Sequence, residues 1–203
     1  MNFNEALKLN GFGDRIEAQY GRWGHFTEAN AQAVIKIADA EVGQGSKTVF
    51  LLSMAMVAFT WVNESSWAFN PMPNVNGKSL SPWNWDIGPF QLNLQWTTRI
   101  VWQGDFAAKG LDWKGVWGQA FYEDDGVTPA AFNGDVVANG RCALRRMLAD
   151  KRQPGPLGFA DRETMQAVLY TGPKAQPARL KNWAKYGEGF KNFFDAYLQK
   201  EQE

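Results

Sequence analysis

Two carboxylates stand out in a stretch that is otherwise free of acidic residues. Between Asn63 and Asn93, only Glu64 and Asp86 are acidic. Glu64 follows the apolar run 48–62 almost at once, and Asp86 lies in a Trp-rich segment that Gly-Pro-Phe-Gln closes. Cleavage of a glycosidic bond needs a carboxylic acid that is still protonated at working pH, and a group that stabilises the oxocarbenium-like centre left behind. The two residues are therefore candidates for acid/base chemistry on a sugar.

The surroundings of the two acids predict different pKa values. An acid at the C-terminal end of a buried helix loses solvation and faces the negative end of the helix dipole, and both effects raise its pKa. Glu64 is in that position, whereas Asp86 has polar and aromatic neighbours that let a carboxylate stay ionised. Two acids with pKa values that are pushed apart are typical of an acid/base pair. Taken singly, a Glu at a helix end is more often a solvated terminus, and an Asp before Ile-Gly more often forms a turn.

The segments ESSWAFNP and DIGPFQLN resemble the lysozyme superfamily, which includes lytic transglycosylases, goose-type lysozymes and C-type lysozymes. In these proteins the catalytic Glu ends a central helix, usually as Glu-Ser, and a segment of the form G-x-x-Q-[ILV]-[ND] lines the cleft. Residues 88–93 fit that form at every position. The resemblance implies that Glu64 is the catalytic acid and that Ser65, Gln91 and Asn93 contact the substrate.

Two further matches extend the resemblance. Asp86 makes the segment D-x-G-x-x-Q-L-N, similar to the C-type lysozyme segment whose Asp is the second catalytic carboxylate, although the 22 positions from Glu64 to Asp86 require a longer hairpin. Tyr170 resembles the tyrosine of the transglycosylase motif A-x-Y-N-x-G that hydrogen-bonds the catalytic Glu, and the resemblance implies that Tyr170 is the fourth residue in contact with the substrate. Here one more residue separates Ala167 from the tyrosine, and Thr171 replaces the usual Asn.

The resemblance implies a peptidoglycan-cleaving muramidase that acts on the MurNAc-β-1,4-GlcNAc bond. In a retaining hydrolase, Asp86 is a nucleophile or ion-pair stabiliser, and the two carboxyl groups lie about 5 to 5.5 Å apart. In a lytic transglycosylase, Glu64 acts alone and the 6-hydroxyl of the sugar attacks, which gives a 1,6-anhydro product. Asp86 favours the first mechanism, whereas Ser65 and Tyr170 favour the second.

Two alternatives remain open. One is a chitinase or chitosanase, since such enzymes share this fold and keep a Glu in the same place. Lys78 and the lack of other acids between Glu64 and Asp86 are unfavourable for binding cationic chitosan. The other is a wall-binding protein on a lysozyme scaffold with little or no turnover. Five aromatic residues are candidates for stacking against sugars or for pinning the irregular lobe to the core: Trp67, Phe69, Trp83, Trp85 and Trp96.

The composition of the chain argues against several other kinds of function and site. With 21 basic and 21 acidic residues, the chain has no net charge to attract nucleic acid or an anionic membrane. One cysteine, Cys142, rules out an intramolecular disulfide, and one histidine, His25, rules out a multi-His metal site. We expect no cofactor, no metal, no membrane insertion and a monomer. Peptidoglycan lies outside the cytoplasm, yet no signal peptide is visible. The export route therefore stays open between a phage enzyme, a specially exported protein and a chain from which a signal peptide has been removed.

The predicted fold is a single mainly α (α+β) domain with a lysozyme-like arrangement. Residues 1–27 form an N-terminal extension, and the core covers about 28–200. A buried central helix over 47–63 is followed by a small irregular or β lobe that begins with a loop or hairpin at 70–85. The other predicted helices cover 28–42 with Thr27 as N-cap, 95–102, 133–150, 161–170 with Asp161 as cap, and 188–199, with 103–132 unassigned and a turn at 152–158.

Overall fold

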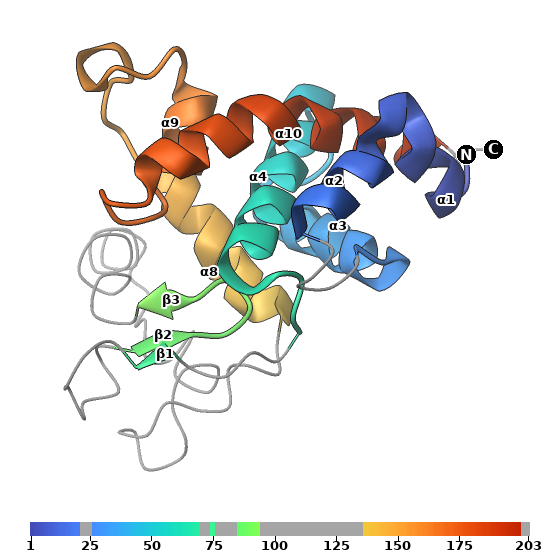
Figure 1. Cartoon of the computed structure of the whole chain (residues 1–203), viewed down its shortest axis with the longest axis horizontal. Helices are drawn as coiled ribbons and strands as arrows, with labels where there is room; N and C mark the ends of the chain where they lie inside the picture. Colours follow the sequence, from blue (N-terminus) through green and yellow to red (C-terminus); the bar gives the residue numbers. More distant parts are fainter. Residues whose placement is uncertain (21–25, 70–73, 76–84, 94–135, 200–203) are drawn as a thin grey trace.

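A computed structural model of the whole chain describes residues 1–20, 26–69, 74–75, 85–93 and 136–199. These residues are mainly helical, which confirms the mainly α class (Figure 1). The described helices are α1 (Phe3–Lys8), η1 (Leu9–Gly11), α2 (Phe12–Tyr20), α3 (Glu28–Val42), α4 (Lys47–Ser65), α8 (Val136–Ala149), η6 (Gly155–Leu157), α9 (Arg162–Val168) and α10 (Gln176–Leu198), where η marks a short 3-10 helix.

The helix α4 lies at the centre of the fold. Every residue from Ser53 to Val62 is buried, and α4 contacts α3, α8, α9 and α10 (Figure 1). A helix that is apolar on all sides needs such neighbours on all sides. By length and composition it is the one helix in the described part of the chain that could cross a membrane, but 61% of its most apolar window is buried by the rest of the fold. The prediction of a buried central helix is confirmed.

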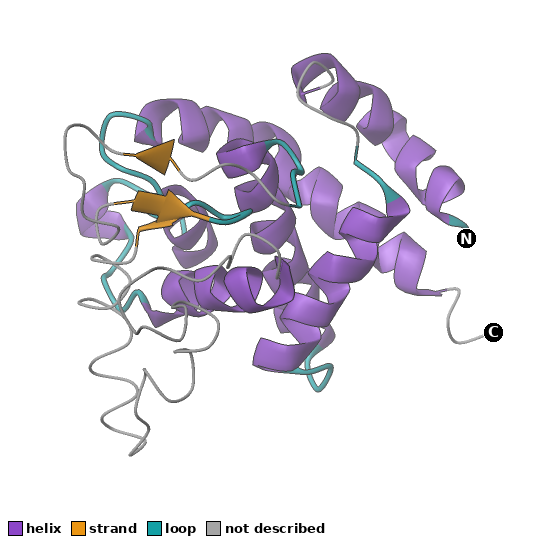
Figure 2. Cartoon of the chain, turned by 90° about the horizontal axis from the view of Figure 1, so that it is seen from below, coloured by secondary structure: helices purple, strands orange, loops and turns teal. Residues whose placement is uncertain are grey.

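A small antiparallel sheet follows α4 in the sequence. Its strands are β1 (Asn74–Val75), β2 (Trp85–Ile87) and β3 (Leu92–Asn93), in the order β1-β2-β3. Figures 1 and 2 show the sheet at one edge of the helical body, and in Figure 1 it lies near the C-terminal end of α4. Asp86 is in the middle strand, where it pairs with Asn74 on one side and Asn93 on the other. The sheet therefore brings Asp86 to the same end of the molecule as Glu64.

The N-terminal helices α1 and α2 are part of the hydrophobic core and do not form an extension outside it. Ala6, Phe12 and Ile16 are buried in the same cluster as the residues of α4 and α10. The ring of Phe12 meets that of Phe190 edge-on, with 5.0 Å between the centroids. The boundary of the core at residue 28 was therefore wrong, because the apolar face of α10 needs α1 and α2 to cover it.

The helix α10 begins twelve positions earlier than the predicted start at 188. Glycines at 187 and 189 suggest a break in the sequence, but both lie inside the helix. A Cβ at Gly189 would lie 2.3 Å from the Phe12 ring, so this glycine lets α2 approach closely. Pro177 is in the first turn, where a helix tolerates proline.

The other boundaries agree closely with the predictions. Thr27 caps α3 by accepting a hydrogen bond from the Asn30 backbone, and Asp161 caps α9 by accepting one from Thr164. The predicted helix 133–150 is observed as α8, and η6 lies within the predicted turn at 152–158. Most of the loop 70–85, the predicted helix 95–102 and the segment 103–132 are outside the described residues.

Candidate active site

The Glu64 side chain lies at the C-terminal end of α4, where the helix stops abruptly. Ser66 and Trp67 both adopt left-handed backbone conformations, with φ of 53° and 69°. Such conformations cost about 1 to 2 kcal/mol each for a residue with a Cβ. The turn is held by the core, since the Trp67 ring packs on Phe26 at 4.6 Å and its carbonyl accepts a hydrogen bond from Asn30. The sharp end of the helix therefore holds Glu64 in a fixed place.

Arg179 from α10 is the direct partner of Glu64. Its Nη1 donates to Oε1 of Glu64 at 2.5 Å, its Nη2 donates to Oγ1 of Thr60 at 2.9 Å, and its Nε donates to the carbonyl of Ala167 at 2.8 Å. The Arg179 side chain is 4% exposed and that of Glu64 is 19% exposed. One guanidinium thus joins α10 to α4 and α9 around the carboxylate.

The contact with Arg179 was not predicted. A signal for it is present in the sequence, because Arg179, Trp183, Tyr186 and Phe190 follow one another at the spacing of one helix face, and all four are buried. An arginine on an otherwise apolar face requires a buried acceptor. With the helix predicted to start only at 188, this face was not recognised.

The pKa of Glu64 is raised above its ordinary value. Burial is the largest cause, because it disfavours the charged form. The positive charge of Arg179, its hydrogen bond and the charge of Arg146 act in the opposite direction, while the negative charge of Asp86 raises the pKa further. The predicted upward shift of the Glu64 pKa is thus confirmed, and Asp86 is close enough to Glu64 to influence this pKa electrostatically.

The segment that follows Asp86 packs directly against the end of α4. Oγ of Ser65 donates to the Pro89 carbonyl at 2.6 Å. Gly88 has φ of 78°, and a Cβ there would lie 2.1 Å from Nδ2 of Asn139 in α8, so only glycine fits. The same Asn139 accepts the backbone N–H of the fully buried Phe90 through Oδ1 at 2.8 Å. The turn after Asp86 is therefore locked between α4 and α8.

The four residues expected to contact the substrate lie around this turn. Ser65 binds Pro89 as above, Nε2 of Gln91 donates to the Gly88 carbonyl at 3.0 Å, and Asn93 pairs through its backbone with Asp86. Tyr170 is buried, and its hydroxyl donates to the Phe90 carbonyl at 2.7 Å.

The expected hydrogen bond from Tyr170 to Glu64 was therefore wrong, because Arg179 occupies that role. The hydroxyl of Tyr170, which lies two positions after the end of α9, instead connects this part of the chain to the turn, and burial raises the pKa of the hydroxyl strongly. The Tyr170 ring still lies beside the charged centre, with the guanidinium carbon of Arg179 at 5.3 Å from the ring centroid.

The aromatic candidates have different positions. Trp67 is 4% exposed and packs in the core, whereas Phe69 is 42% exposed and meets Trp61 edge-on. Trp83 and Trp96 are outside the described residues, and Trp85 is described as part of β2. Of the two whose side chains the structure describes, Trp67 and Phe69, it is thus Phe69 that has a ring surface within reach of a ligand.

The site contains no group of His, Cys, Asp and Glu side chains suited to a metal ion among the residues that the structure describes. His25 is outside that part of the chain. Cys142 is buried, and burial raises the pKa of its thiol well above the ordinary value, so it is a core residue without nucleophilic character.

Comparison with protein-family models, with curated proteins and with solved structures found no match to this chain.

Proposed function

We propose that this chain is a peptidoglycan-cleaving muramidase with a lysozyme-like fold, and that Glu64 is the general acid/base at the MurNAc-β-1,4-GlcNAc bond. The observation that carries the proposal is the Glu64 carboxyl itself. It ends a buried central helix, its pKa is raised by burial, and the turn after Asp86 packs against it through Ser65 and Pro89. A carboxylic acid that stays protonated beside a second carboxylate is what glycosidic bond cleavage requires.

In the first step, protonated Glu64 gives its proton to the bridging oxygen, the bond from C1 of MurNAc to that oxygen breaks, and GlcNAc leaves with a free 4-hydroxyl. Positive charge develops at C1, and the carboxylate of Asp86 stabilises it or bonds to it. In the hydrolytic route, water then adds a hydroxyl group to C1 and returns its proton to Glu64. In the transglycosylase route, the 6-hydroxyl of the same MurNAc bonds to C1 and returns its proton to Glu64.

Arg179 has a defined part in this scheme. Its charge and hydrogen bond favour the ionised form of Glu64, which is the form present after the proton has been given away. Since desolvation raises the pKa and Arg179 opposes it, the balance between them sets the pH at which Glu64 is able to work both as acid and as base. Arg179 is therefore a positioning residue for Glu64.

The same contact favours a second candidate, a wall-binding protein without turnover. A buried Arg that donates one hydrogen bond to a carboxylate, one to Thr60 and one to the Ala167 carbonyl is also what a purely structural ion pair looks like. In that case Glu64 would join α4 to α10 and nothing more.

Clearing of a suspension of purified cell walls separates the two candidates. The proposal predicts that the wild type lowers the turbidity and that Glu64→Gln reduces the rate by about 10²-fold or more, since general acid catalysis contributes about 10² to 10⁴. Glu188→Gln, which changes an exposed glutamate on α10, is the matched control and should clear at the wild-type rate. A Glu64→Gln variant that clears as fast as the control would remove Glu64 from the mechanism. Binding to the walls without clearing by the wild type would favour the second candidate.

A further inference from the structure

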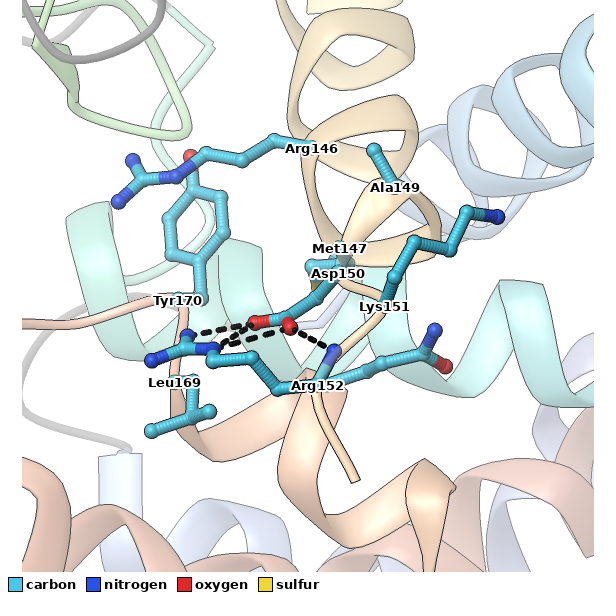
Figure 3. A pocket seen from close by; sticks show the side chains of 9 residues that line it. Arg146, Met147, Ala149, Asp150, Lys151, Arg152, Leu169 and Tyr170 are labelled. Atoms are coloured by element: carbon cyan, nitrogen blue, oxygen red, sulfur yellow. Dashed lines mark hydrogen bonds and ion pairs between the residues drawn. The ribbon is translucent and has the colours of Figure 1, made fainter. Parts of the chain in front are cut away.

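A pocket of about 370 Å³ lies between the C-terminal end of α8 and the helix α9 (Figure 3). This volume is in the range of sites that hold small molecules or parts of larger ones. Its lining combines cationic, apolar and polar side chains: Arg146, Met147, Ala149, Asp150, Lys151, Arg152, Gln166, Leu169 and Tyr170. Glu64 is not among them, so the pocket is separate from the carboxyl group proposed to be catalytic.

The charge of the pocket lining is predominantly positive. It contains three cations, Arg146, Lys151 and Arg152, against the single carboxylate of Asp150. Arg152 and Asp150 are already paired, with Nη2 at 2.6 Å from Oδ2, and this contact lowers the Asp150 pKa. The charges of Arg146 and Lys151 are therefore left for a ligand. Within the part of the chain that the structure describes, no carboxylate pairs with either of them.

The Arg146 side chain is already oriented. Its guanidinium carbon lies 4.8 Å from the centroid of the Tyr170 ring, and Figure 3 shows it extended across that ring. Stacking on an aromatic face fixes the plane of a guanidinium and leaves its N–H groups at the edge available to an anion. A carboxylate that arrives there meets a donor that has lost part of its conformational freedom beforehand.

Tyr170 connects this pocket to the Glu64 site. Its ring is close to two guanidinium groups, Arg146 in the pocket and Arg179 beside Glu64, at 4.8 and 5.3 Å. A ligand in the pocket would therefore be bound one side chain away from the Glu64–Arg179 pair. A polymer cleaved at Glu64 would carry its neighbouring substituents into this region.

We propose that the pocket binds a free carboxylate of the peptide stem that branches from muramic acid, with Arg146 and Lys151 as the groups that recognise it. This inference rests on the proposed muramidase function and names the part of the substrate that the pocket binds. The stem carries free carboxylates among alanine methyl groups, and the pocket sets Arg146 and Lys151 beside the apolar Met147 and Leu169. The glycan hydroxyl groups alone would give two cations nothing to neutralise.

The test uses the disaccharide GlcNAc-MurNAc with its peptide stem and, as the form without the stem, the same disaccharide with its lactyl carboxyl group capped as an amide, since the uncapped group would itself be a free carboxylate. A muramidase does not cut this disaccharide, because its one internal bond joins GlcNAc C1 to MurNAc. Both ligands can therefore be titrated calorimetrically into the active wild-type chain. We expect the stem-bearing form to bind about tenfold more tightly, as one charge-assisted hydrogen bond provides about 1.4 kcal/mol. Raising the salt concentration from 50 mM to 500 mM should reduce this preference.

Substitutions in the pocket test whether it causes the preference for the stem-bearing disaccharide. Arg146→Gln and Lys151→Gln should each lower the preference for the stem-bearing form, and the double variant should abolish it. Lys8→Gln changes an exposed lysine on α1, at the opposite end of the molecule from α9 in Figure 1, and should keep the preference. Because Lys151 is exposed and forms no hydrogen bond or ion pair with the residues that the structure describes, its variant remains informative if Arg146→Gln is unstable.

The outcomes separate this inference from the proposed function. If the wild type cleaves peptidoglycan in a Glu64-dependent manner but binds both disaccharides equally, or if the preference survives in the double variant, the pocket does not read the stem. Tighter binding of a phosphate-bearing wall polymer than of the stem would likewise overturn the inference. If the wild type yields no Glu64-dependent product, the proposed function fails, whatever the titrations show.

Discussion

Replacement of Arg179 by Met is the perturbation that most directly probes the site. The substitution keeps a long side chain but removes three hydrogen bonds, to Glu64, to Thr60 and to the Ala167 carbonyl. Arg179 is 4% exposed, so water does not readily replace it. The variant therefore leaves a largely buried carboxylate, Glu64, and two further acceptors without their donor.

The size of the effect depends on the charge of Glu64. With Glu64 protonated, the loss reflects the unpaired acceptors, about 1 to 3 kcal/mol. With Glu64 ionised, the variant also leaves an uncompensated charge in the interior, and breaking such a pair costs about 3 to 5 kcal/mol. The destabilisation of Arg179→Met should therefore be larger at pH 8 than at pH 4.

The pKa of Glu64 determines whether the destabilisation by Arg179→Met grows or shrinks as the pH rises. In the folded wild type this pKa is raised above the value of 4.5 for a free Glu side chain, so the stability contributed by protonated Glu64 is lost as the pH rises through the folded pKa. Removing Arg179 raises the folded pKa further, because its charge and hydrogen bond lower it in the wild type. The extra loss in the variant thus develops above the wild-type pKa, at a slope of up to about 1.4 kcal/mol per pH unit.

Urea unfolding of the wild type and of Arg179→Met at both pH values measures this difference. Arg145→Met is the matched control, since Arg145 pairs with the buried Glu41 at 2.7 Å on the α3–α8 side of the fold. It should destabilise the protein without moving the pH profile of the activity, whereas Arg179→Met should move the alkaline limb of that profile, where Glu64 loses its proton, to higher pH. An equal loss at pH 4 and pH 8, or an unchanged profile, would refute the reasoning.

Three further substitutions test the surroundings of the site. Gly88→Ala should lower Tm far more than Gly43→Ala. Both glycines have positive φ, but a Cβ at 88 would lie 2.1 Å from a side-chain nitrogen of α8, whereas a Cβ at 43 would have no atom within 4 Å. Equal shifts in Tm would show that the close packing at Gly88 is unimportant. Tyr170→Phe leaves a buried carbonyl without its donor and should cost about 1 to 3 kcal/mol in urea unfolding, with the pH profile unchanged; a shifted profile would mean that the hydroxyl acts on Glu64 directly. Asp86→Asn removes a charge that raises the Glu64 pKa, so the pH profile of the activity should shift to lower pH. A loss of activity beyond about 10²-fold would in addition assign Asp86 a direct chemical role.

Much of the helical framework could be predicted from the sequence because local rules determine it. The central helix is apolar on every side, and its neighbours α3 and α9 begin at polar caps that the sequence displays, Thr27 and Asp161. The raised pKa of Glu64 also followed from its position at the end of a buried helix. These features depend on residues that are close together in the sequence.

The features that were missed depend on distant residues. Arg179 and Glu64 are 115 positions apart. The apolar face around Arg179 indicates that this residue needs a buried acceptor, but nothing in the sequence identifies Glu64 as that acceptor. The glycines inside α10 are breakers by propensity, yet Gly189 is needed for the approach of the Phe12 ring. The partner of the Tyr170 hydroxyl likewise depends on where α9 packs against the turn at Phe90, which only the tertiary structure defines.

Mass spectrometry of the soluble products released from purified peptidoglycan tests the central claim most directly, with Glu64→Gln as the control. The account predicts fragments that the wild type releases and the variant does not. Ends with reducing N-acetylmuramic acid would identify a hydrolase, and ends lighter by about 18 mass units, one water, would identify a lytic transglycosylase. Release of products from chitin oligomers instead would move the activity to a chitinase-type substrate. The same products from the wild type and Glu64→Gln, or none from either, would contradict the assignment of Glu64 as the catalytic acid.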